Sequence, residues 1–192
     1  GAAWSASPVR LTLNGSSHRI IIPARAAEQD KDFVIGALVR LSSISGTRQI
    51  LARQEAANNR RFWQLRSNAG ALEFVSFTTA AAGSVVAGSA GSVVAGQWLL
   101  ATAYVTNTSA QIRANGVEVG SGTFPQRNTE VRRGVPIMAG ARIGPTGSIT
   151  ESMAGDFAGM ALKFAATADD IATLEADLRA IANAKGITLP TA

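Results

Sequence analysis

The side chains that most often perform chemistry in proteins are scarce in this chain. Its 192 residues contain no Cys and a single His, His18, which follows an Asn-Gly turn and has no Ser-Asp set near it in the sequence. The absence of Cys excludes disulfides, thiolate metal sites and cysteine catalysis, and one His excludes a multi-histidine metal site. A lone His beside a turn is more often a surface or capping residue than a catalytic base.

Aromatic residues close to arginines are the remaining candidates for ligand recognition. Three Arg residues accompany Trp63 in the sequence: Arg60, Arg61 and Arg66. An aromatic face beside guanidinium groups suits an anionic glycan or a carboxylate-bearing partner, whereas the alternative is that the Trp63 ring caps a sheet edge. Trp98 and Tyr104 could also stack on sugar rings, but they lie in an apolar segment and are expected to fill the core.

A second basic group lies in the polar segment 126–134, which we expect to be exposed. It comprises Arg132 and Arg133 together with Arg127. Arg132 and Arg133 join Trp63 and its three neighbouring arginines as predicted ligand-binding residues. Nucleic-acid binding would need aromatic residues interleaved with such charges on one platform, and the sequence shows no such arrangement.

The charge is distributed unevenly along the chain. The sequence up to Arg142 has 15 basic and 7 acidic residues, a net +8, and the remainder has 3 basic and 6 acidic residues, a net −3, which gives +5 overall. A basic body with an acidic tail is consistent with attraction to a polyanion, or with head-to-tail matching between copies in an assembly. The simpler alternative is scattered surface Arg, because no long Lys/Arg block is present.

These residues must be positioned by many short strands. Asn14-Gly15 and Asn115-Gly116 are strong turn signals, because Asn and Gly tolerate positive φ. One face of the segment 32–41 is expected to carry Phe33, Ile35, Ala37 and Val39. The predicted strands are 9–13, 19–23, 32–41, 49–52, 62–66, 72–77, 97–106, 110–114, 117–119, 135–143 and 157–164. Short strands with frequent turns indicate a sandwich or barrel rather than alternating strands and helices.

The C-terminal residues change from strand to helix periodicity. Thr167 is the predicted N-cap, and Lys185 with Gly186 fits a helix end. An apolar stripe with spacings of three and four residues is formed by Ile171, Leu174, Leu178 and Ile181. Such a stripe packs on the sandwich of its own chain, or alternatively binds a neighbouring subunit.

Two further features suggest contacts between chains. The sequence AGSVVAG occurs at 82–88 and again at 90–96, which predicts an uncharged docking surface or, alternatively, a tolerated duplication in a surface loop. Residues 1–8 read as an extended arm, because they are small residues followed by Pro8. The predicted assembly residues are Trp4, Val85, Val86, Val93, Val94, Ile171, Leu174 and Leu178.

A family resemblance runs through most of the chain. It is carried by 11–23 (LTLNGSSHRIIIP), 33–40 (FVIGALVR), 62–66 (FWQLR), 70–74 (GALEF), 96–104 (GQWLLATAY), 112–119 (IRANGVEV), 136–144 (PIMAGARIG) and 155–162 (GDFAGMAL). Their order over about 165 of the 192 residues resembles a laminin-G-like domain of the concanavalin A-like lectin/glucanase superfamily. The resemblance implies an all-β, two-sheet antiparallel jelly-roll sandwich at 9–166, with a C-terminal α-helix and tail at 167–192.

The resemblance also defines what an active site would require. Enzymes of this superfamily carry two catalytic Glu flanking an Asp on one strand, because one carboxylate acts as nucleophile or base and the other as acid. The close acidic pairs of this chain, Asp30/Asp32, Asp169/Asp170 and Glu175/Asp177, lack that arrangement. Asp156 and Asn128 are candidate calcium ligands, but no cluster of oxygen ligands accompanies them. We therefore expect no enzyme activity, no metal and no cofactor.

The fold hosts many functions, so three hypotheses follow. The first is a virion structural protein of a tailed bacteriophage, in the capsid decoration or the tail, with other virion proteins, copies of itself and cell-surface glycans as partners. The alternatives are a free carbohydrate-binding module and an electrostatic nucleic-acid binder, the latter less favoured. No apolar run approaches the roughly 20 residues that cross a bilayer, and no signal peptide is recognisable. The expected location is the virion, or otherwise an extracellular or cytoplasmic one.

Overall fold

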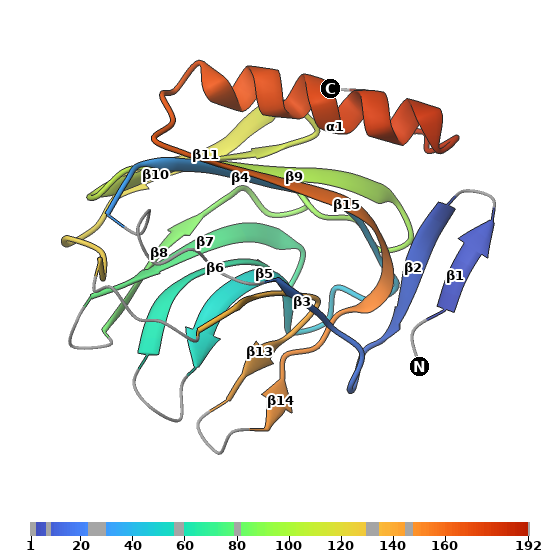
Figure 1. Ribbon diagram of the computed structural model, residues 1–192, viewed down its shortest axis with the longest axis horizontal. Helices are drawn as coiled ribbons and strands as arrows, with labels where there is room; N and C mark the ends of the chain where they lie inside the picture. The colour runs from blue at the N-terminus through green and yellow to red at the C-terminus, as the bar shows by residue number, and fades with distance from the viewer. Residues whose placement is uncertain are drawn as a thin grey trace.

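Two β-sheets face each other, and a C-terminal helix covers the outer face of one of them (Figure 1). The computed structural model describes residues 3–6, 9–22, 30–55, 60–78, 82–129, 135–144 and 148–191. The first sheet, here called the helix-covered sheet, has the order β1-β2-β15-β4-β9-β10-β11. Its strands are β1 (Ala3–Ala6), β2 (Val9–Asn14), β15 (Ala154–Phe164), β4 (Phe33–Leu41), β9 (Trp98–Val105), β10 (Ser109–Ala114) and β11 (Val117–Thr123).

The second sheet, here called the opposite sheet, has the order β14-β13-β5-β6-β7-β8, with β12 paired to β5 and β3 paired to β12. Its strands are β14 (Ile149–Thr150), β13 (Arg142–Ile143), β5 (Thr47–Glu55), β6 (Arg60–Asn68), β7 (Ala71–Phe77), β8 (Gly83–Ala87), β12 (Ile137–Ala139) and β3 (Ile20–Ile22). Neighbouring strands pair antiparallel in both sheets, except that β13 and β5 pair in parallel at Ile143 and Glu55. The predicted all-β antiparallel sandwich with a C-terminal helix is confirmed.

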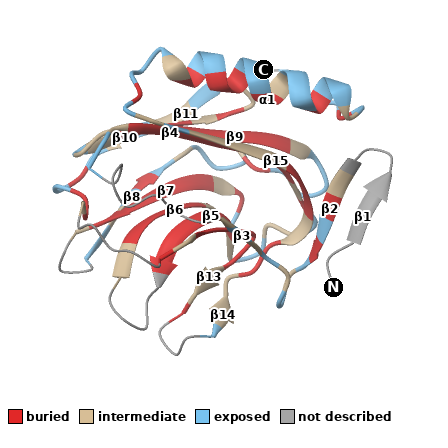
Figure 2. Ribbon diagram, in the orientation of Figure 1, coloured by how far each residue is buried: buried red, intermediate tan, exposed pale blue. Residues whose placement is uncertain are grey.

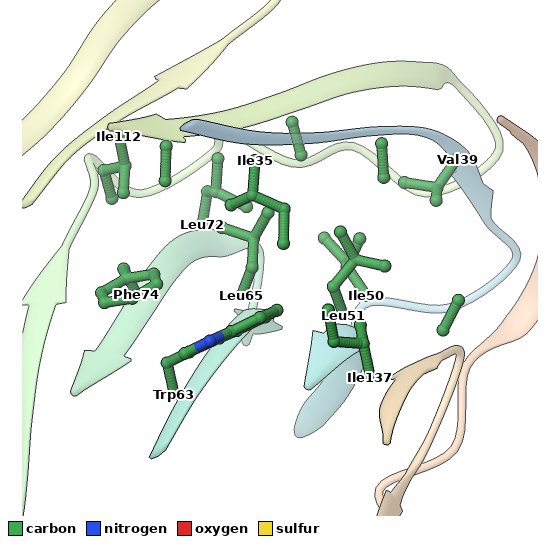
Figure 3. Close-up of a cluster of buried hydrophobic side chains, with 14 of the residues drawn as sticks. Ile35, Val39, Ile50, Leu51, Trp63, Leu65, Leu72, Phe74, Ile112 and Ile137 are labelled. Atoms are coloured by element: carbon green, nitrogen blue, oxygen red, sulfur yellow. The ribbon is translucent and has the colours of Figure 1, made fainter. Parts of the chain in front are cut away.

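The core between the sheets follows from the period-two alternation of the strands. The residues of β4 that point toward the opposite sheet are Phe33, Ile35, Ala37 and Val39, as the sequence predicts, and all are at most 2% exposed. They meet Leu65, Leu72 and Phe74 from the facing strands (Figure 3). The intervening residues of β4, Val34 and Leu38, point outward and form a second core under the helix. Because β4 is buried on both faces, its segment is almost continuously apolar.

Helix α1 (Asp170–Ala184) lies on the helix-covered sheet and contacts β4, β9 and β15. Figure 2 shows that the buried side of the helix faces the sheet. The fourth residue of the predicted stripe, Ile181, is 37% exposed. The other three, Ile171, Leu174 and Leu178, are buried against this sheet and are 4%, 6% and 0% exposed. The hypothesis that these three residues bind a neighbouring subunit is therefore wrong, because their own chain already covers them. No helix within the described ranges is long and apolar enough to cross a membrane.

The ends of α1 match the sequence prediction at one terminus. Gly186 has φ +66° directly after Lys185, which ends the helix where expected. At the other terminus the predicted cap is wrong, because the helix begins two residues later than expected, with Asp169 as N-cap. Thr167 is instead the donor, since its backbone N–H lies 2.8 Å from Oδ2 of Asp170.

The two AGSVVAG copies adopt different structures. The first contains strand β8, the edge strand beside β7, whereas the second lies in turns before β9. Val86 and Val93 are 4% and 1% exposed and belong to the core, so they are not available for assembly contacts. Val85 and Val94 are 50% and 47% exposed and stay predictions for such contacts.

The N-terminal segment differs from the extended arm expected for residues 1–8. Within it, Ala3–Ala6 form strand β1, which pairs with β2 from Ala3 opposite Thr12 to Ala6 opposite Val9. This part of the segment is therefore an edge strand of the helix-covered sheet. The side chain of Trp4 lies outside the described residues, so its predicted assembly role stays a prediction.

Candidate functional site

Trp63, the centre of the predicted ligand-binding group, is a core residue. Its ring centroid lies 5.6 Å from that of Phe33 and 6.5 Å from that of Phe74, and the residue is 5% exposed (Figure 3). Trp63 lies on the face of β6 that points toward the helix-covered sheet. The prediction that its ring is offered to a ligand is therefore wrong.

The arginines near Trp63 in sequence do not gather around it in space. Arg66 lies on the other face of β6, where its Nε is 2.8 Å from Oε2 of Glu73. The guanidinium of Arg61 lies 5.9 Å from the ring centroid of Phe77, and Arg60 is half-buried at the start of β6. Side chains three residues apart on a strand point to opposite faces, which separates Trp63 from Arg66.

The second basic group is only partly described. Arg132 and Arg133 lie outside the described residues, and their predicted role stays a prediction. Arg127 is 4% exposed, with its Nε 3.1 Å from the backbone oxygen of Thr106 and its guanidinium 5.4 Å from the ring centroid of Phe33. Burial lowers the pKa of Arg127. The expectation that it lies on an exposed loop is wrong, because the side chain closes one end of the core.

The outer face of the opposite sheet carries a hydrogen-bonded row of polar side chains. Nε2 of Gln49 lies 3.0 Å from Oε1 of Gln64 and 2.6 Å from Oε2 of Glu151, and Gln64 donates to Gln54. The three glutamines are at most 2% exposed. These buried side chains largely satisfy one another, so the row stabilises strand pairing rather than presenting groups to a ligand.

An accessible polar site lies instead on the helix-covered sheet, beside the apolar patch under α1. Under the helix, Ala158, Leu38 and Leu100 lie on three adjacent strands. Two positions further along those strands are Asp156, Arg40 and Trp98. Arg40 pairs in register with both Asp156 and Trp98, and Asp156 also pairs with Thr12 of β2. Four strands thus contribute one side chain each to a single row on the outer face.

A pocket of about 450 Å³ opens over this row. Thr12, Arg40 and Asp156 line it, together with Ser42 and Gly96 at the sheet end. The volume is in the range of small-molecule sites. This pocket is the candidate site.

Asp156 holds the polar groups of the pocket together. Its Oδ1 accepts a hydrogen bond from Oγ1 of Thr12 at 2.8 Å and lies 3.1 Å from Nε of Arg10. Its Oδ2 accepts from Nε of Arg40 at 2.8 Å and also from Nη2 of Arg40. Asp156 is 4% exposed, so this buried carboxylate is fully paired. Two guanidinium groups around one carboxylate leave the site with a net positive charge.

Trp98 flanks the pocket on β9. The guanidinium of Arg40 lies 5.6 Å from its ring centroid, and the residue is half-buried at the border of the apolar patch under α1. Trp98 and Tyr104, which are predicted to fill the core, lie on the outer face of β9 and are half-buried against the core under α1 rather than between the sheets. The site thus combines charge, hydroxyl groups and an aromatic ring.

A close approach of two strands shapes the pocket floor. Gly155 has φ +142°, and a Cβ at this position would lie 1.9 Å from the backbone oxygen of Arg40. Only glycine therefore allows β15 to lie against β4 here.

Sequence reasoning missed this site because its residues are distant along the chain, 144 positions apart for Thr12 and Asp156. The sequence does contain one sign of the site, which is a single polar residue on the outward face of each apolar strand. This pattern does not show which strands are neighbours in the sheet, so it cannot bring the polar residues together.

The candidate calcium ligands are not placed for a metal. The oxygens of Asp156 face arginines and Thr12, and Asn128 donates from Nδ2 to the backbone oxygen of Arg61 at 3.0 Å. Within the described part of the chain, no three His, Asp or Glu residues form a group that could hold a metal ion.

Comparisons with known proteins show the same fold. The CBM40 module of the Ruminococcus gnavus IT-sialidase, solved with α2,3-sialyllactose, aligns with a TM-score of 0.66 and 13% identity over 88% of this chain and 98% of that module. A structure of botulinum neurotoxin type C, whose cell entry depends on interaction with two ganglioside molecules, also aligns. Its TM-score is 0.66, with 13% identity over 93% of this chain and 45% of that one. A pentraxin from Limulus polyphemus aligns with a TM-score of 0.60 and 14% identity over 83% of this chain and 77% of its own.

The sequence comparison gives the family. No curated protein matches the chain. A laminin G family model, described as the concanavalin A-like lectin/glucanases superfamily, matches residues 14–172. This match runs from the end of β2 to the beginning of α1 and leaves out β1 and most of β2. The chain therefore belongs to the concanavalin A-like lectin/glucanase superfamily.

Proposed function

We propose that this protein is a carbohydrate-binding module that holds a glycan in the pocket formed by Thr12, Asp156 and Arg40. The observation that carries the proposal is the row of these three side chains with the half-buried Trp98 beside them. Lectin-type sites combine charged hydrogen-bonding groups with an aromatic face, because sugars present hydroxyl groups at their edges and C–H groups on their faces. Proteins with a similar fold support the proposal, because one was solved with sialyllactose and another interacts with gangliosides.

The pocket favours binding over hydrolysis. Glycosidases need two carboxylates flanking the scissile bond. Among the described residues that line the pocket, Asp156 is the only acid, and it is neutralised by Arg10 and Arg40. The expected absence of enzyme activity stays a prediction, to be checked by assaying bound glycans for release of reducing sugars.

The test is glycan binding by the wild type and by two matched variants. Trp98→Ala should weaken binding roughly tenfold, because it removes an aromatic contact. Arg66→Ala removes an arginine of a similar Arg–carboxylate pair on the opposite sheet, and it should leave affinity unchanged. A glycan array without any bound sugar would refute the proposal, and so would equal losses in both variants.

The virion role, the virion partners and the virion location are carried forward as predictions from the sequence. A glycan-binding module is compatible with a place on a particle surface. Mass spectrometry of purified particles tests this role directly, because a protein absent from the particles is not a virion component.

A further inference from the structure

Trp98 separates the candidate site from a second pocket. This pocket has a volume of about 210 Å³ and is lined by Trp98 and by Asn115 in the turn after β10. Gln97, Ser92 and Asn115 contribute its polar groups, and Pro190 of the C-terminal tail borders it. Trp98 lines this second pocket, and its ring faces Arg40, which lines the first. The Arg40–Trp98 pair is therefore the boundary that the two pockets share.

The two pockets lie side by side along one sheet end. The first is centred on β15 and β4, and the second lies beyond β9. Strands are about 4.8 Å apart, so two strands separate the pocket centres by roughly 10 Å. Three linked pyranose rings can span this distance, with the middle ring over Trp98 and the outer two in the pockets.

The pockets differ in charge. The first contains the guanidinium of Arg40, whose side chain is 37% exposed. Asp156 engages Nε and Nη2 of Arg40, and within the described residues Nη1 makes no hydrogen bond. Arginine thus retains donors that can face a ligand carboxylate. The described lining of the second pocket holds amide and hydroxyl groups and no charged side chain.

We propose that the two pockets are adjacent subsites for one acidic oligosaccharide. The sugar that bears the carboxylate occupies the first subsite, with its carboxylate on Nη1 of Arg40. A neutral sugar occupies the second subsite and bonds to the amide of Gln97. The inference rests on the proposed carbohydrate-binding function and adds the number of subsites, the charge of the ligand and its direction across Trp98.

Matched glycan pairs test the charge of the ligand. The array should contain acidic glycans, such as sialyllactose and glucuronosyl disaccharides, beside the same glycans without the charged sugar or with the carboxylate reduced to an alcohol. We expect the acidic member of a pair to bind at least tenfold more tightly. We also expect this preference to weaken as salt is added, since the exposed guanidinium is screened.

Two variants test the subsites separately, by titration calorimetry with the acidic glycan that the array selects. Arg40→Gln should abolish the preference for the acidic member, so that the acidic glycan and its neutral counterpart bind with similar affinity. Gln97→Ala should weaken the oligosaccharide several-fold and leave the affinity for the free acidic monosaccharide unchanged. Circular dichroism and the melting temperature verify folding, and the salt dependence of the wild type decides the charge question if Arg40→Gln does not fold.

The outcomes distinguish this inference from the proposed function. Binding of neutral glycans only overturns the acidic first subsite but leaves the carbohydrate-binding function intact. If Gln97→Ala leaves the affinity for acidic oligosaccharides unchanged, as it should for the acidic monosaccharide, the second subsite is refuted. A wild-type protein that binds no glycan refutes the proposed function, and the inference falls with it.

Discussion

Asp156 and Arg53 show two ways in which this chain buries a charge. Asp156 is surrounded by two arginines and the Thr12 hydroxyl, so its burial is compensated. Arg53 is 2% exposed, and its guanidinium lies 5.0 Å from the ring centroid of Phe62. Among the residues that the structure describes, its Nε and Nη2 have no hydrogen-bond partner. Burial lowers the pKa of Arg53 to about 10. A buried cation that lacks such partners opposes folding.

We expect Arg53→Met to stabilise the protein. Methionine keeps the contact with Phe62 and removes the desolvated charge, which should raise the free energy of unfolding by about 1–3 kcal/mol. Urea denaturation at neutral pH measures the change. Arg19→Met, at an exposed position, is the control and should change stability by less than about 0.5 kcal/mol. A destabilised Arg53→Met variant would show that the guanidinium has a favourable role.

Glu151 couples stability to acid pH. Burial raises the pKa of its carboxyl, but hydrogen bonds from Arg142 and Gln49 and the charges of Arg142 and Arg66 outweigh it, so the pKa is below 4.5. A carboxyl with a lowered folded-state pKa contributes stability above the unfolded pKa, and this contribution is lost as pH falls through the folded pKa. Glu151→Gln removes the titrating group.

Denaturation of wild type and Glu151→Gln across the acid range checks this coupling. We expect the wild type to be more stable at pH 7 and the difference to shrink as the pH falls below about 4.5. A difference that stays constant through the acid range would contradict the assignment.

At the scale of elements, α1 is held by polar as well as apolar contacts. Oε1 of Glu175 lies 2.6 Å from Oγ1 of Thr102 and 2.8 Å from Nε of Arg113, and Glu175 is 5% exposed. Asp177, two residues later, is exposed. The two acids look equivalent in the sequence. Packing of the helix on the sheet buries Glu175 in stabilising contacts and leaves Asp177 in solvent.

Glu175→Ala should therefore destabilise the protein far more than Asp177→Ala. The first variant leaves Thr102 and Arg113 without their partner and should lower the free energy of unfolding by about 2 kcal/mol. This loss is smaller than for a fully buried pair, because the Arg113 side chain is 24% exposed and water screens its charge. The second should stay within about 0.5 kcal/mol of the wild type. Equal effects in chemical denaturation would show that the Glu175 contacts do not fasten the helix.

Gly36 sets the distance between α1 and β4. A Cβ at Gly36 would lie 2.6 Å from Leu174 Cδ2, 2.8 Å from Leu178 Cδ1 and 2.9 Å from Thr102 Cγ2. Gly36→Ala should therefore lower stability by about 1–3 kcal/mol. Gly159→Ala is the matched control on β15, because its Cβ would have an ordinary contact, 3.7 Å from Ile181. A melting temperature unchanged in Gly36→Ala would contradict the tight packing.

At the scale of the whole molecule, α1 divides the outer face of the helix-covered sheet. The helix lies over this sheet (Figure 1) and covers an apolar patch that includes Val34, Leu38 and Leu100. The adjoining sheet end carries the polar row and the two pockets. The helix and the proposed site thus share one face of the sheet. The helix covers one stretch of each strand, and the site lies further along the same strands.

Removal of residues 167–192 should expose the apolar patch. We expect this variant to aggregate or to bind a hydrophobic dye, because large exposed apolar patches promote association. Size-exclusion chromatography with light scattering checks the outcome. A monodisperse, folded variant with the wild-type melting temperature would show that the sandwich does not depend on the helix.

The sequence by itself determined the features that depend on neighbours along the chain. The alternation at 33–41, the Asn115-Gly116 turn and the helical stripe starting at Ile171 are local patterns, and they predicted a strand, a hairpin and a helix correctly. The Asn14-Gly15 turn does not join a hairpin, because β2 and β3 belong to different sheets. Order and spacing of such elements were sufficient for the sandwich and its family.

Only the tertiary structure decided which side chains meet. Trp63 and Arg66 are neighbours in sequence, but the pleat of β6 places them on opposite faces. Thr12, Asp156, Arg40 and Trp98 come from distant segments, and strand pairing places them in one row. The physical reason is that the order of strands in a sheet is set by the packing of the entire chain, which no single segment encodes.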